Sequence, residues 1–493
     1  MRWVVLACMV GASVGASGCF TGEDALGLAC DGPHQCGIGQ PCLTGFCGGP
    51  TATTEGSASV TTSNASTGSS EGGSSSTGVD DGSGSGSSST TAADGCAPVT
   101  VPQCQGGPVA SPMIESYVFS HAELGNASSA VVWDWSGDGV DDLAVLDFVG
   151  WDVTLLRADA GRQWARLANV DRTMTGVDNP YDMAIADLDG DGDPQLVLVS
   201  IDAGQMGVVE WSDGAFGAPL TTGIATTGLF SMALADVHGD ACPELLAAGN
   251  GVVVVVPNID GSLFGNPTAS FMGDLTEPWE VFVWGQGSDA RVLVPSTHDD
   301  SFDGLGMHPV HVLRVPQDEP ITLTPASPSV LATNFRNPWA VAGGDFDGDG
   351  MEELAVVERN LTEANEGTDV AGRLRFFRVV ATDVEELVPG GIAVGVGPRE
   401  LLATDLDCDG RSDLVVGTTG APMQGGAPQV LFGAATLDAM TPIDVAVPDV
   451  SVGNRMAIGD FDDDGRPEVV IPDYGRSDAL PSNRIVVVEA VAG

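Results

Sequence analysis

The sequence predicts an all-β protein whose main domain is a seven-bladed β-propeller. A nine-residue pattern, D-x-D-x-D-G-x-x-[D/E], recurs through the last three quarters of the chain. Its copies follow one another at steps of about 50 residues, and each stands between two short runs of β-branched and apolar residues. A repeat of this length, with several short strands per unit, is typical of propellers and similar β-arrays.

The pattern occurs in complete, nearly complete and weak copies, whose nine places we number 1 to 9. Three complete copies supply an acid at places 1, 3, 5 and 9: Asp345, Asp347, Asp349 and Glu353; Asp405, Asp407, Asp409 and Asp413; Asp460, Asp462, Asp464 and Glu468. Two copies carry one substitution each, at place 3 or at place 9: Asp134, Ser136, Asp138 and Asp142; Asp187, Asp189, Asp191 and Gln195. A weak copy has Ala241 in place of the glycine: Asp236, His238, Asp240 and Glu244.

The spacing suits a hard cation such as Ca²⁺, which takes six to eight oxygen ligands. In a tight loop, the side chains of places 1, 3 and 5 point inward, and glycine at place 6 permits the positive φ of the bend. Place 7 offers its carbonyl, and the carboxylate at place 9 completes the set. We expect about three to five structural Ca²⁺ sites and no other cofactor. The weak copy is doubtful because imidazole is a poor Ca²⁺ ligand and Ala241 resists the bend.

Strands rather than helices flank the loops, as the apolar runs 414–416 and 469–471 illustrate. The pattern is therefore strand–loop–strand and differs from an EF-hand. The alternative to a metal site is an Asp-rich turn held by side-chain hydrogen bonds to the backbone. Five good copies in one context favour the cation, because several carboxylates converging in one loop repel each other.

The spacing of the copies predicts seven units. The first aspartates are separated by steps of 53, 49, 109, 60 and 55 residues. The double step predicts a fourth unit with strands at 279–284 and 290–294, in which Trp284, Gln286 and Ser288 replace the ligands. In the first unit we expect strands at about 130–134, 142–148, 152–158 and 163–170.

The last unit is predicted to close the ring. It offers only three strands, and an additional strand at 114–119 precedes the first unit. We expect this strand to complete the seventh blade, because closure removes the open edges of the ring.

These repeats resemble the FG-GAP/VCBS-type repeats, the calcium-loop repeats of integrin α-subunit propellers and of many bacterial surface proteins. The resemblance covers about residues 113–493. It implies structural Ca²⁺ between the first two strands of a blade, and ligand binding through other loops, usually on the opposite face. The family includes adhesins, lectins and polysaccharide lyases, so the fold alone does not decide the function.

Residues 1–18 have the features of a secretory signal, with Arg2 before a short apolar run and small residues at its end. The run is too short to span a membrane. The residues before Cys19 resemble a bacterial lipoprotein signal, which implies a lipid on Cys19, although Ala16 stands where leucine is usual. Residues 19–29 would then form a tether. The alternative is ordinary cleavage that releases a soluble product.

The cysteines predict an oxidising compartment. Four of them lie in a small module of residues 30–47 and predict two disulfides whose pairing stays open: Cys30, Cys36, Cys42 and Cys47. A zinc site is the alternative there. Cys96 and Cys104 are expected to pair with each other in residues 96–112, which we call the lead-in segment. Cys242 and Cys408 fall in loops of units that are not neighbours, so we expect two unpaired thiols.

Composition separates the remaining segments. Residues 48–95 are almost only Ser, Thr, Gly and Ala with a few acids, which predicts a disordered linker between the cysteine module and a propeller at 113–493.

The formal charge is −50, from 68 acidic and 18 basic residues, and every basic residue is arginine. Such a chain is a poor partner for nucleic acid and for anionic lipid surfaces.

No catalytic motif stands out. Outside the predicted signal and linker, the sequence contains no G-x-S-x-G, H-E-x-x-H or Walker pattern. His298, His308 and His311, with neighbouring acids, form one His/Asp cluster in unit four. It predicts either a second metal or acid/base site, or an elaborated surface loop with ordinary histidines.

Aromatic and arginine residues give further hints. Three tryptophans near strand starts could stack on sugars, with packing between blades as the alternative: Trp151, Trp279 and Trp339. Three arginines follow one strand and either meet an acidic glycan or pair with neighbouring acids: Arg373, Arg375 and Arg378.

The sequence as a whole predicts an exported surface protein, anchored in the outer membrane or at the cell surface by a lipid and otherwise secreted. Its expected function is non-catalytic, calcium-dependent binding of a glycan or a protein partner. A polysaccharide-active lyase or hydrolase is the first alternative, and a purely structural envelope lipoprotein is the second.

Overall fold

The computed structural model describes part of the chain: residues 42–43, 46–47, 96–98, 104 and 107–493, without 122–123, 160–162, 203, 225–227, 259–263, 265–266, 272–277, 297–306, 317–322, 360–369, 381–382, 421–425, 448–449 and 476–482. The chain forms two compact units, Met1–Ser87 and Ser88–Gly493. In the first, β1 (Cys42–Leu43) pairs with β2 (Phe46–Cys47). The predicted boundaries before residue 96 and the lipidation of Cys19 lie outside the described residues.

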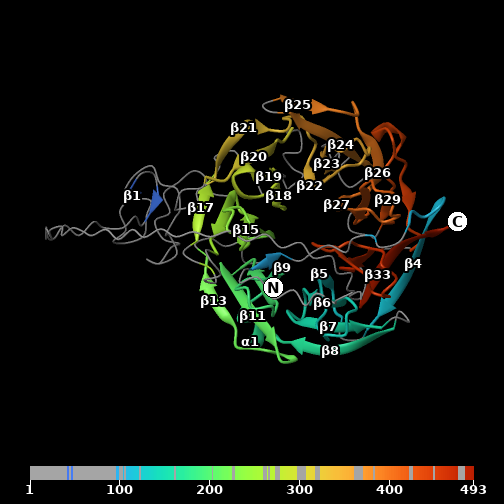
Figure 1. Cartoon of the computed structure of the whole chain (residues 1–493). Helices are drawn as coiled ribbons and strands as arrows, with labels where there is room; N and C mark the ends of the chain where they lie inside the picture. The colour runs from blue at the N-terminus through green and yellow to red at the C-terminus, as the bar shows by residue number, and fades with distance from the viewer. Residues whose placement is uncertain are drawn as a thin grey trace, which may run out of the picture. The chain divides into compact units, whose positions relative to one another are not determined.

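The second unit is a seven-bladed β-propeller, as predicted (Figure 1). Each blade is an antiparallel sheet whose first strand lies at the centre of the ring. Blade one contains β5 (Ala127–Trp133), β6 (Asp142–Asp147), β7 (Val153–Ala158) and β8 (Trp164–Val170); blade two contains β9 (Pro180–Asp187), β10 (Gln195–Ser200), β11 (Gln205–Ser212), β12 (Ala215–Phe216) and β13 (Leu220–Gly223); blade three contains β14 (Ser231–Ala235), β15 (Glu244–Gly249), β16 (Val252–Val256) and β17 (Thr268–Phe271). Blade four contains β18 (Phe282–Trp284), β19 (Arg291–Pro295), β20 (Val310–Arg314) and β21 (Thr324–Val330); blade five contains β22 (Pro338–Gly344), β23 (Glu353–Glu358), β24 (Ala371–Val380), β25 (Asp383–Glu386) and β26 (Ile392–Val396). Blade six contains β27 (Pro398–Thr404), β28 (Asp413–Thr418), β29 (Gln429–Leu431) and β30 (Ile443–Asp444), and blade seven contains β31 (Ala457–Gly459), β32 (Glu468–Pro472) and β33 (Arg484–Ala492).

The ring closes through a strand from the start of the propeller. β4 (Pro112–Ser120) pairs with β33 over nine residues, from Arg484↔Ser120 to Ala492↔Pro112, and is the outer strand of blade seven. The predicted closure is confirmed. A long antiparallel ladder between two distant chain segments joins the first and last parts of the propeller, so backbone hydrogen bonds close the ring.

Hydrophobic clusters join each blade to the next. Successive residues of a strand point to opposite faces of its sheet, and both faces of a blade are covered by neighbouring blades. In β16, Val252, Val254 and Val256 pack toward blade two, whereas Val253 and Val255 pack toward blade four. This arrangement explains the uninterrupted valine run, because a strand buried on both faces needs no polar alternation.

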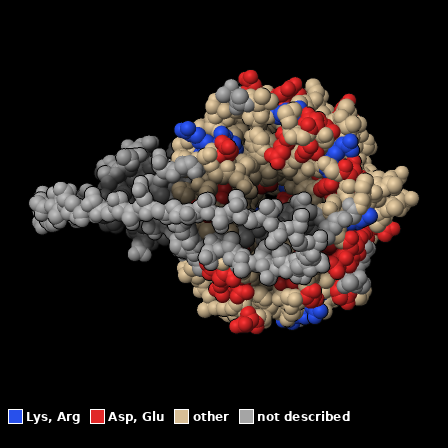
Figure 2. Space-filling model, in the orientation of Figure 1, with Lys and Arg blue, Asp and Glu red and all other residues tan. Residues whose placement is uncertain are grey.

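In the described part of the chain, three short helical segments lie in connections between strands. They are α1 (Arg172–Thr175), which Asp171 caps, η2 (Gly287–Asp289) and η5 (Leu437–Ala439). Among the described residues, no helix is long and apolar enough to cross a membrane. Figure 2 shows acidic side chains spread over one face of the disc and few basic ones, as the formal charge of −50 requires.

Candidate functional site

The predicted loops join the first and second strands of their blades and make the expected bend. At place 6, Gly350 has φ +83° and Gly410 has φ +89°, in the left-handed region that only glycine enters without strain. The aspartate at place 1 holds the bend together. In blade five, Asp345 accepts hydrogen bonds from the backbone N–H of Gly348 at 2.8 Å and of Gly350 at 2.9 Å.

Carboxylate oxygens converge in four of these loops, within 4.8 Å of one another. The groups are Asp187, Asp189 and Asp191; Asp345, Asp347 and Glu353; Asp405, Asp407 and Asp413; Asp460, Asp462 and Asp464. Oxygens at such spacing could together bind one hard cation. The local electrostatics fit this, because acids that crowd without a cation favour their neutral forms.

In the loop of blade six, two of the predicted ligands have strongly raised pKa values. Burial raises the pKa of Asp413 to about 8, and Asp407 adds to it by repulsion. Burial also raises the pKa of Asp407 to about 6, with Asp409 and Asp405 as further causes. A bound cation would restore the charged forms of these groups.

The residue at place 9 ties the loop to the blade. One of its oxygens accepts the backbone N–H of place 2, as Glu468 does from Phe461 at 2.7 Å. The partner of the other oxygen differs between blades: Asp413 accepts there from the backbone N–H of Gly433, and Glu353 accepts from Arg378. In blade two, Gln195 Oε1 accepts from Leu188 at 2.5 Å, and its amide nitrogen donates to Asp189 at 3.1 Å. In this orientation Gln195 presents N–H groups to the loop, which does not favour its predicted role as a ligand.

An arginine enters the loop of blade five. Arg378, on the third strand β24, donates to Glu353 and lies 2.9 Å from Asp349 and 3.5 Å from Asp347. Its guanidinium therefore lies among the acids that the pattern assigns to a cation. Of the predicted arginine row, Arg375 also pairs with an acid, Glu386, at 2.9 Å. For these two residues, the prediction of pairing with neighbouring acids is confirmed.

The weak loop of blade three makes the same bend although Ala241 stands in place of glycine. Ala241 adopts φ +74°, and its N–H reaches Asp236 at 3.0 Å. This left-handed conformation costs an L-residue about 1–2 kcal/mol. The fold tolerates it beside a disulfide at Cys242. Burial raises the pKa of Glu244, at place 9, to about 7.

The loop of blade four also differs from the prediction. Its strands pair in the register Trp284↔Arg291, whereas the other blades pair place 9 with the residue before place 1. The loop is thus two residues shorter, and Arg291 replaces the acid at place 9. The predicted substitutes Trp284, Gln286 and Ser288 therefore do not occupy ligand places. The deletion explains why no motif is recognisable there.

The disulfides in the propeller were predicted with the wrong partners. Cys96 bonds to Cys242, and Cys104 bonds to Cys408. Cys242 and Cys408 are therefore not free thiols, and Cys96 and Cys104 do not pair with each other. The side chains of the four cysteines in residues 30–47 lie outside the described residues.

The lead-in segment explains this pairing. Its β3 (Ala97–Pro98) adds to β9 at the centre of the ring, and Val109 donates to the carbonyl of Asp407 at 2.8 Å. The segment is thus anchored at loops of blades three and six, which lie on opposite sides of the ring. Each cysteine meets a different loop, and this proximity depends on the closed ring rather than on sequence spacing.

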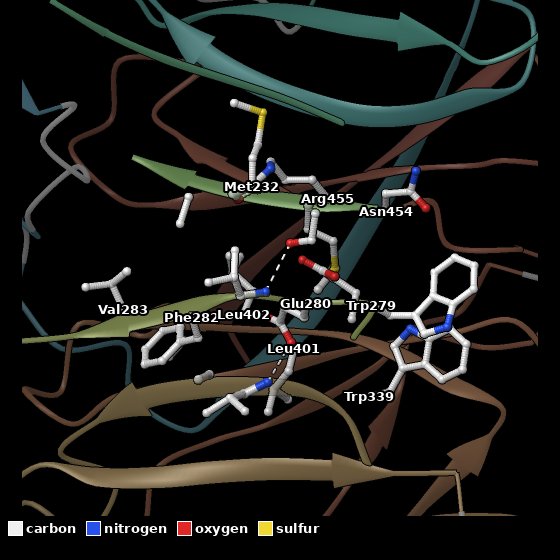
Figure 3. A pocket seen from close by; sticks show the side chains of 18 of the residues that line it. Met232, Trp279, Glu280, Phe282, Val283, Trp339, Leu401, Leu402, Asn454 and Arg455 are labelled. Atoms are coloured by element: carbon white, nitrogen blue, oxygen red, sulfur yellow. Dashed lines mark hydrogen bonds between the residues drawn. The ribbon is translucent and has the colours of Figure 1, made fainter. Parts of the chain in front are cut away.

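A second candidate site lies in the central channel. A cavity of about 360 Å³ is lined by inner strands of blades three to seven (Figure 3). Trp279 and Trp339 stack beside it with ring centroids 5.3 Å apart, and Arg399 lies over Trp339. Trp151 lies outside this cavity, with Arg172 over its ring. Two of the three predicted tryptophans are thus brought together, and both pack against other rings.

The channel also holds charged residues that the sequence analysis missed. They are Asp182, Glu280, Glu400 and Arg455, each five residues before place 1 of its blade. Aligning the repeats on place 1 places Asp182, Glu400 and Arg455 in one layer, whereas Glu280 joins them only through the shorter loop that the structure shows in blade four. The predicted histidine cluster is described only in part. His308 lies just before β20, His311 lies within β20 and is buried, and His298 lies outside the described residues.

No protein-family model and no curated protein matches this sequence. Solved structures with a similar fold include BBS1N in complex with ARL6DN, at 12% identity and a TM-score of 0.46, over 75% of this chain and 95% of that one. A functionally unknown protein from Desulfotomaculum acetoxidans is also similar, at 12% identity and a TM-score of 0.43, over 66% of this chain and 87% of that one.

Proposed function

We propose that this protein is an exported propeller, stabilised by Ca²⁺, that binds a glycan or a protein partner at the cell surface without catalysing a reaction. The observation that carries the proposal is the loop of blade six, where Asp405, Asp407 and Asp413 converge within 4.8 Å. Among the residues that the structure describes, no arginine pairs with the buried Asp413, since Arg411 pairs with Asp409 in the same loop, and a divalent cation would supply the missing charge. Ca²⁺ would fix the loop geometry and take no part in chemistry.

Export to an oxidising compartment is supported by the two disulfides of the propeller. Disulfides persist outside the cytosol and are rare within it. Together with the signal-like residues 1–18, they support a lipid anchor on Cys19 or secretion. Labelling of the protein with radioactive palmitate in a bacterial host, lost in Cys19→Ala, is the expected result for the anchor.

A polysaccharide-active enzyme is the second candidate, favoured by Glu280 and Glu400 in the channel cavity. Burial raises the pKa of Glu400 to about 8 and that of Glu280 well above its usual value. Glycoside hydrolysis uses a pair of carboxyl groups, one of which stays protonated to act as the acid.

One experiment separates these functions. The purified protein is applied to a panel of immobilised polysaccharides with Ca²⁺ or with chelator, and the supernatants are analysed for cleavage products. Calcium-dependent retention without products is expected. Cleavage products would show that the protein is an enzyme. Failure to be retained on any polysaccharide would contradict glycan binding, and a protein partner would then be sought.

A further inference from the structure

Equivalent positions at the start of the inner strands surround one end of the channel. They lie six residues before place 1: Ser128, Tyr181, Phe230, Trp279, Trp339, Arg399 and Asn454. The rings pack in an arc, with Phe230 and Trp279 stacked at 4.2 Å. Trp279 in turn stacks on Trp339, whose ring also lies under Arg359 and Arg399. The faces of these rings are therefore covered, and their edges remain for a ligand.

Cross-channel hydrogen bonds fix part of this end. Arg399 donates to the Tyr181 hydroxyl at 3.1 Å and to Asn454 at 2.6 Å. One layer deeper, Arg455 forms a bidentate pair with Asp182, with distances of 3.1 and 2.8 Å. These bonds hold residues of blades two, six and seven in place, so the site is organised before any ligand arrives.

Two carboxyl groups are left to face the cavity. Glu280 accepts one hydrogen bond, from the backbone N–H of Val341 at 2.8 Å. Glu400 has the backbone N–H of Met456 as a partner. Both line the cavity of about 360 Å³, a size typical of small-molecule sites. In Figure 3, Glu280 and Arg455 lie beside the cavity, with Trp279 and Trp339 stacked at one side.

The charges around the cavity nearly cancel. Arg455 neutralises Asp182, and Arg399, from the layer above, acts on Glu400. Glu280 and Glu400 together hold at least one proton at neutral pH, because burial raises both pKa values. A site with little net charge does not attract an ion. Ring edges carry positive partial charge and suit oxygen atoms better than cations. A carboxyl group can accept or donate a hydrogen bond, and both suit the hydroxyl groups of a ligand.

We propose that this cavity binds one residue of a neutral sugar, with Glu280 and Glu400 hydrogen-bonding its hydroxyls and Trp279 lining one side. The inference deepens the proposed glycan binding and rests on it. It places the recognition site at the channel end formed by the starts of the inner strands. The metal loops follow the other end of these strands.

The test is titration calorimetry and tryptophan fluorescence in Ca²⁺ with the methyl glycosides of glucose, galactose and mannose, and with N-acetylglucosamine. We expect at least one sugar to bind and to change the fluorescence. Glu280→Gln and Glu400→Gln, which keep the side-chain shape, should each weaken binding about tenfold. Trp279→Phe should remove most of the fluorescence change. Glu385→Gln, on the exposed side of β25, is the matched control and should bind like the parent protein.

Three results would overturn the inference. One is unchanged sugar affinity in both channel variants, provided that they melt like the control. Another is binding of arginine methyl ester or glucuronate in preference to the neutral sugars. The third is retention on a polysaccharide with no response to any monosaccharide, which would leave the proposed function intact and move the site elsewhere. If neither polysaccharides nor monosaccharides bind, glycan binding itself fails.

Discussion

The loops of blades five and six have the same complete motif but different neighbours on the third strand. In blade five, Leu354 pairs with Phe377, so Arg378 stands beside Glu353 and donates to it. In blade six, Leu414 pairs with Leu431, so Phe432 takes the position of Arg378, and Gly433 offers Asp413 only a backbone N–H, at 2.7 Å. Arg411 pairs there with Asp409 at 2.5 Å. In blade five a guanidinium reaches the acid at place 9, and in blade six it reaches only the acid at place 5.

This difference appears in the acids at place 9. Burial raises the pKa of Glu353, but the hydrogen bond from Arg378 opposes the rise. Asp413 has no such partner, and its pKa rises to about 8. A motif that predicts a metal site therefore does not predict its affinity. We infer that Ca²⁺ binds blade six more tightly than blade five. In blade five the ion must compete with a guanidinium for the buried acid at place 9, whereas in blade six Arg411 pairs only with the exposed Asp409.

The largest effect is expected from removing the disulfide that ties the lead-in segment to blade six. Cys104→Ser with Cys408→Ser should lower the free energy of unfolding by about 4 kcal/mol, because the bond closes a long loop of the unfolded chain. Cys408 lies between two predicted ligands, so Ca²⁺ affinity at blade six should fall as well. Denaturant melts with and without Ca²⁺ measure both effects.

The control for that variant is Cys96→Ser with Cys242→Ser, at the loop of blade three. It should lose a comparable free energy of unfolding, yet keep the full stabilisation by Ca²⁺. Equal losses of Ca²⁺ stabilisation in the two variants would contradict a specific link between the lead-in segment and blade six.

Asp413→Asn should abolish most of the stabilisation by Ca²⁺ from blade six. A site filled at 100 times its dissociation constant contributes about 2.7 kcal/mol. In chelator the change should be small, because Asp413, with its raised pKa of about 8, is largely neutral at pH 7. Thermal melts in both conditions check this, with exposed Asp438→Asn as control. An equal loss in chelator would refute the metal assignment for this loop.

Arg378→Gln should reverse the behaviour of blade five. In chelator it should cost about 1–3 kcal/mol, because buried Glu353 loses its charged partner. In Ca²⁺ the cost should shrink, since the ion takes the place that the guanidinium leaves. Melts of the variant at several Ca²⁺ concentrations measure the crossover. A Ca²⁺ dependence identical to that of the parent would show that Arg378 does not compete with the ion.

The smallest effect is expected from Gln195→Glu in blade two. The new carboxylate would keep the hydrogen bond from Leu188 and direct an oxygen, in place of an amide N–H, toward Asp189. Ca²⁺ affinity at this loop should rise about tenfold, or 1.4 kcal/mol. Calorimetric titration measures it, with Gln163→Glu on the surface as control. Unchanged affinity would mean that place 9 contributes little to binding.

The sequence by itself determined the features that arise within one repeat. The runs of β-branched and apolar residues beside each motif predicted the strands, and the double step between motifs predicted a blade without ligands. The spare strand at 114–119 predicted the closure that β4 provides. The strands and the missing ligands depend on neighbours within about 50 residues, so periodicity reports them directly. The closure was predicted by counting the strands of the first and last units.

Only the tertiary structure decided which distant residues meet. Cys104 and Cys408 are 304 positions apart and touch because the ring brings the lead-in segment to blade six. Arg378 reaches Glu353 through strand register, and Arg455 reaches Asp182 across the channel. Sequence spacing does not encode such contacts, because they depend on the closed geometry of seven blades. The motif specified where carboxylates gather, and the surrounding fold set how much charge remains for a cation.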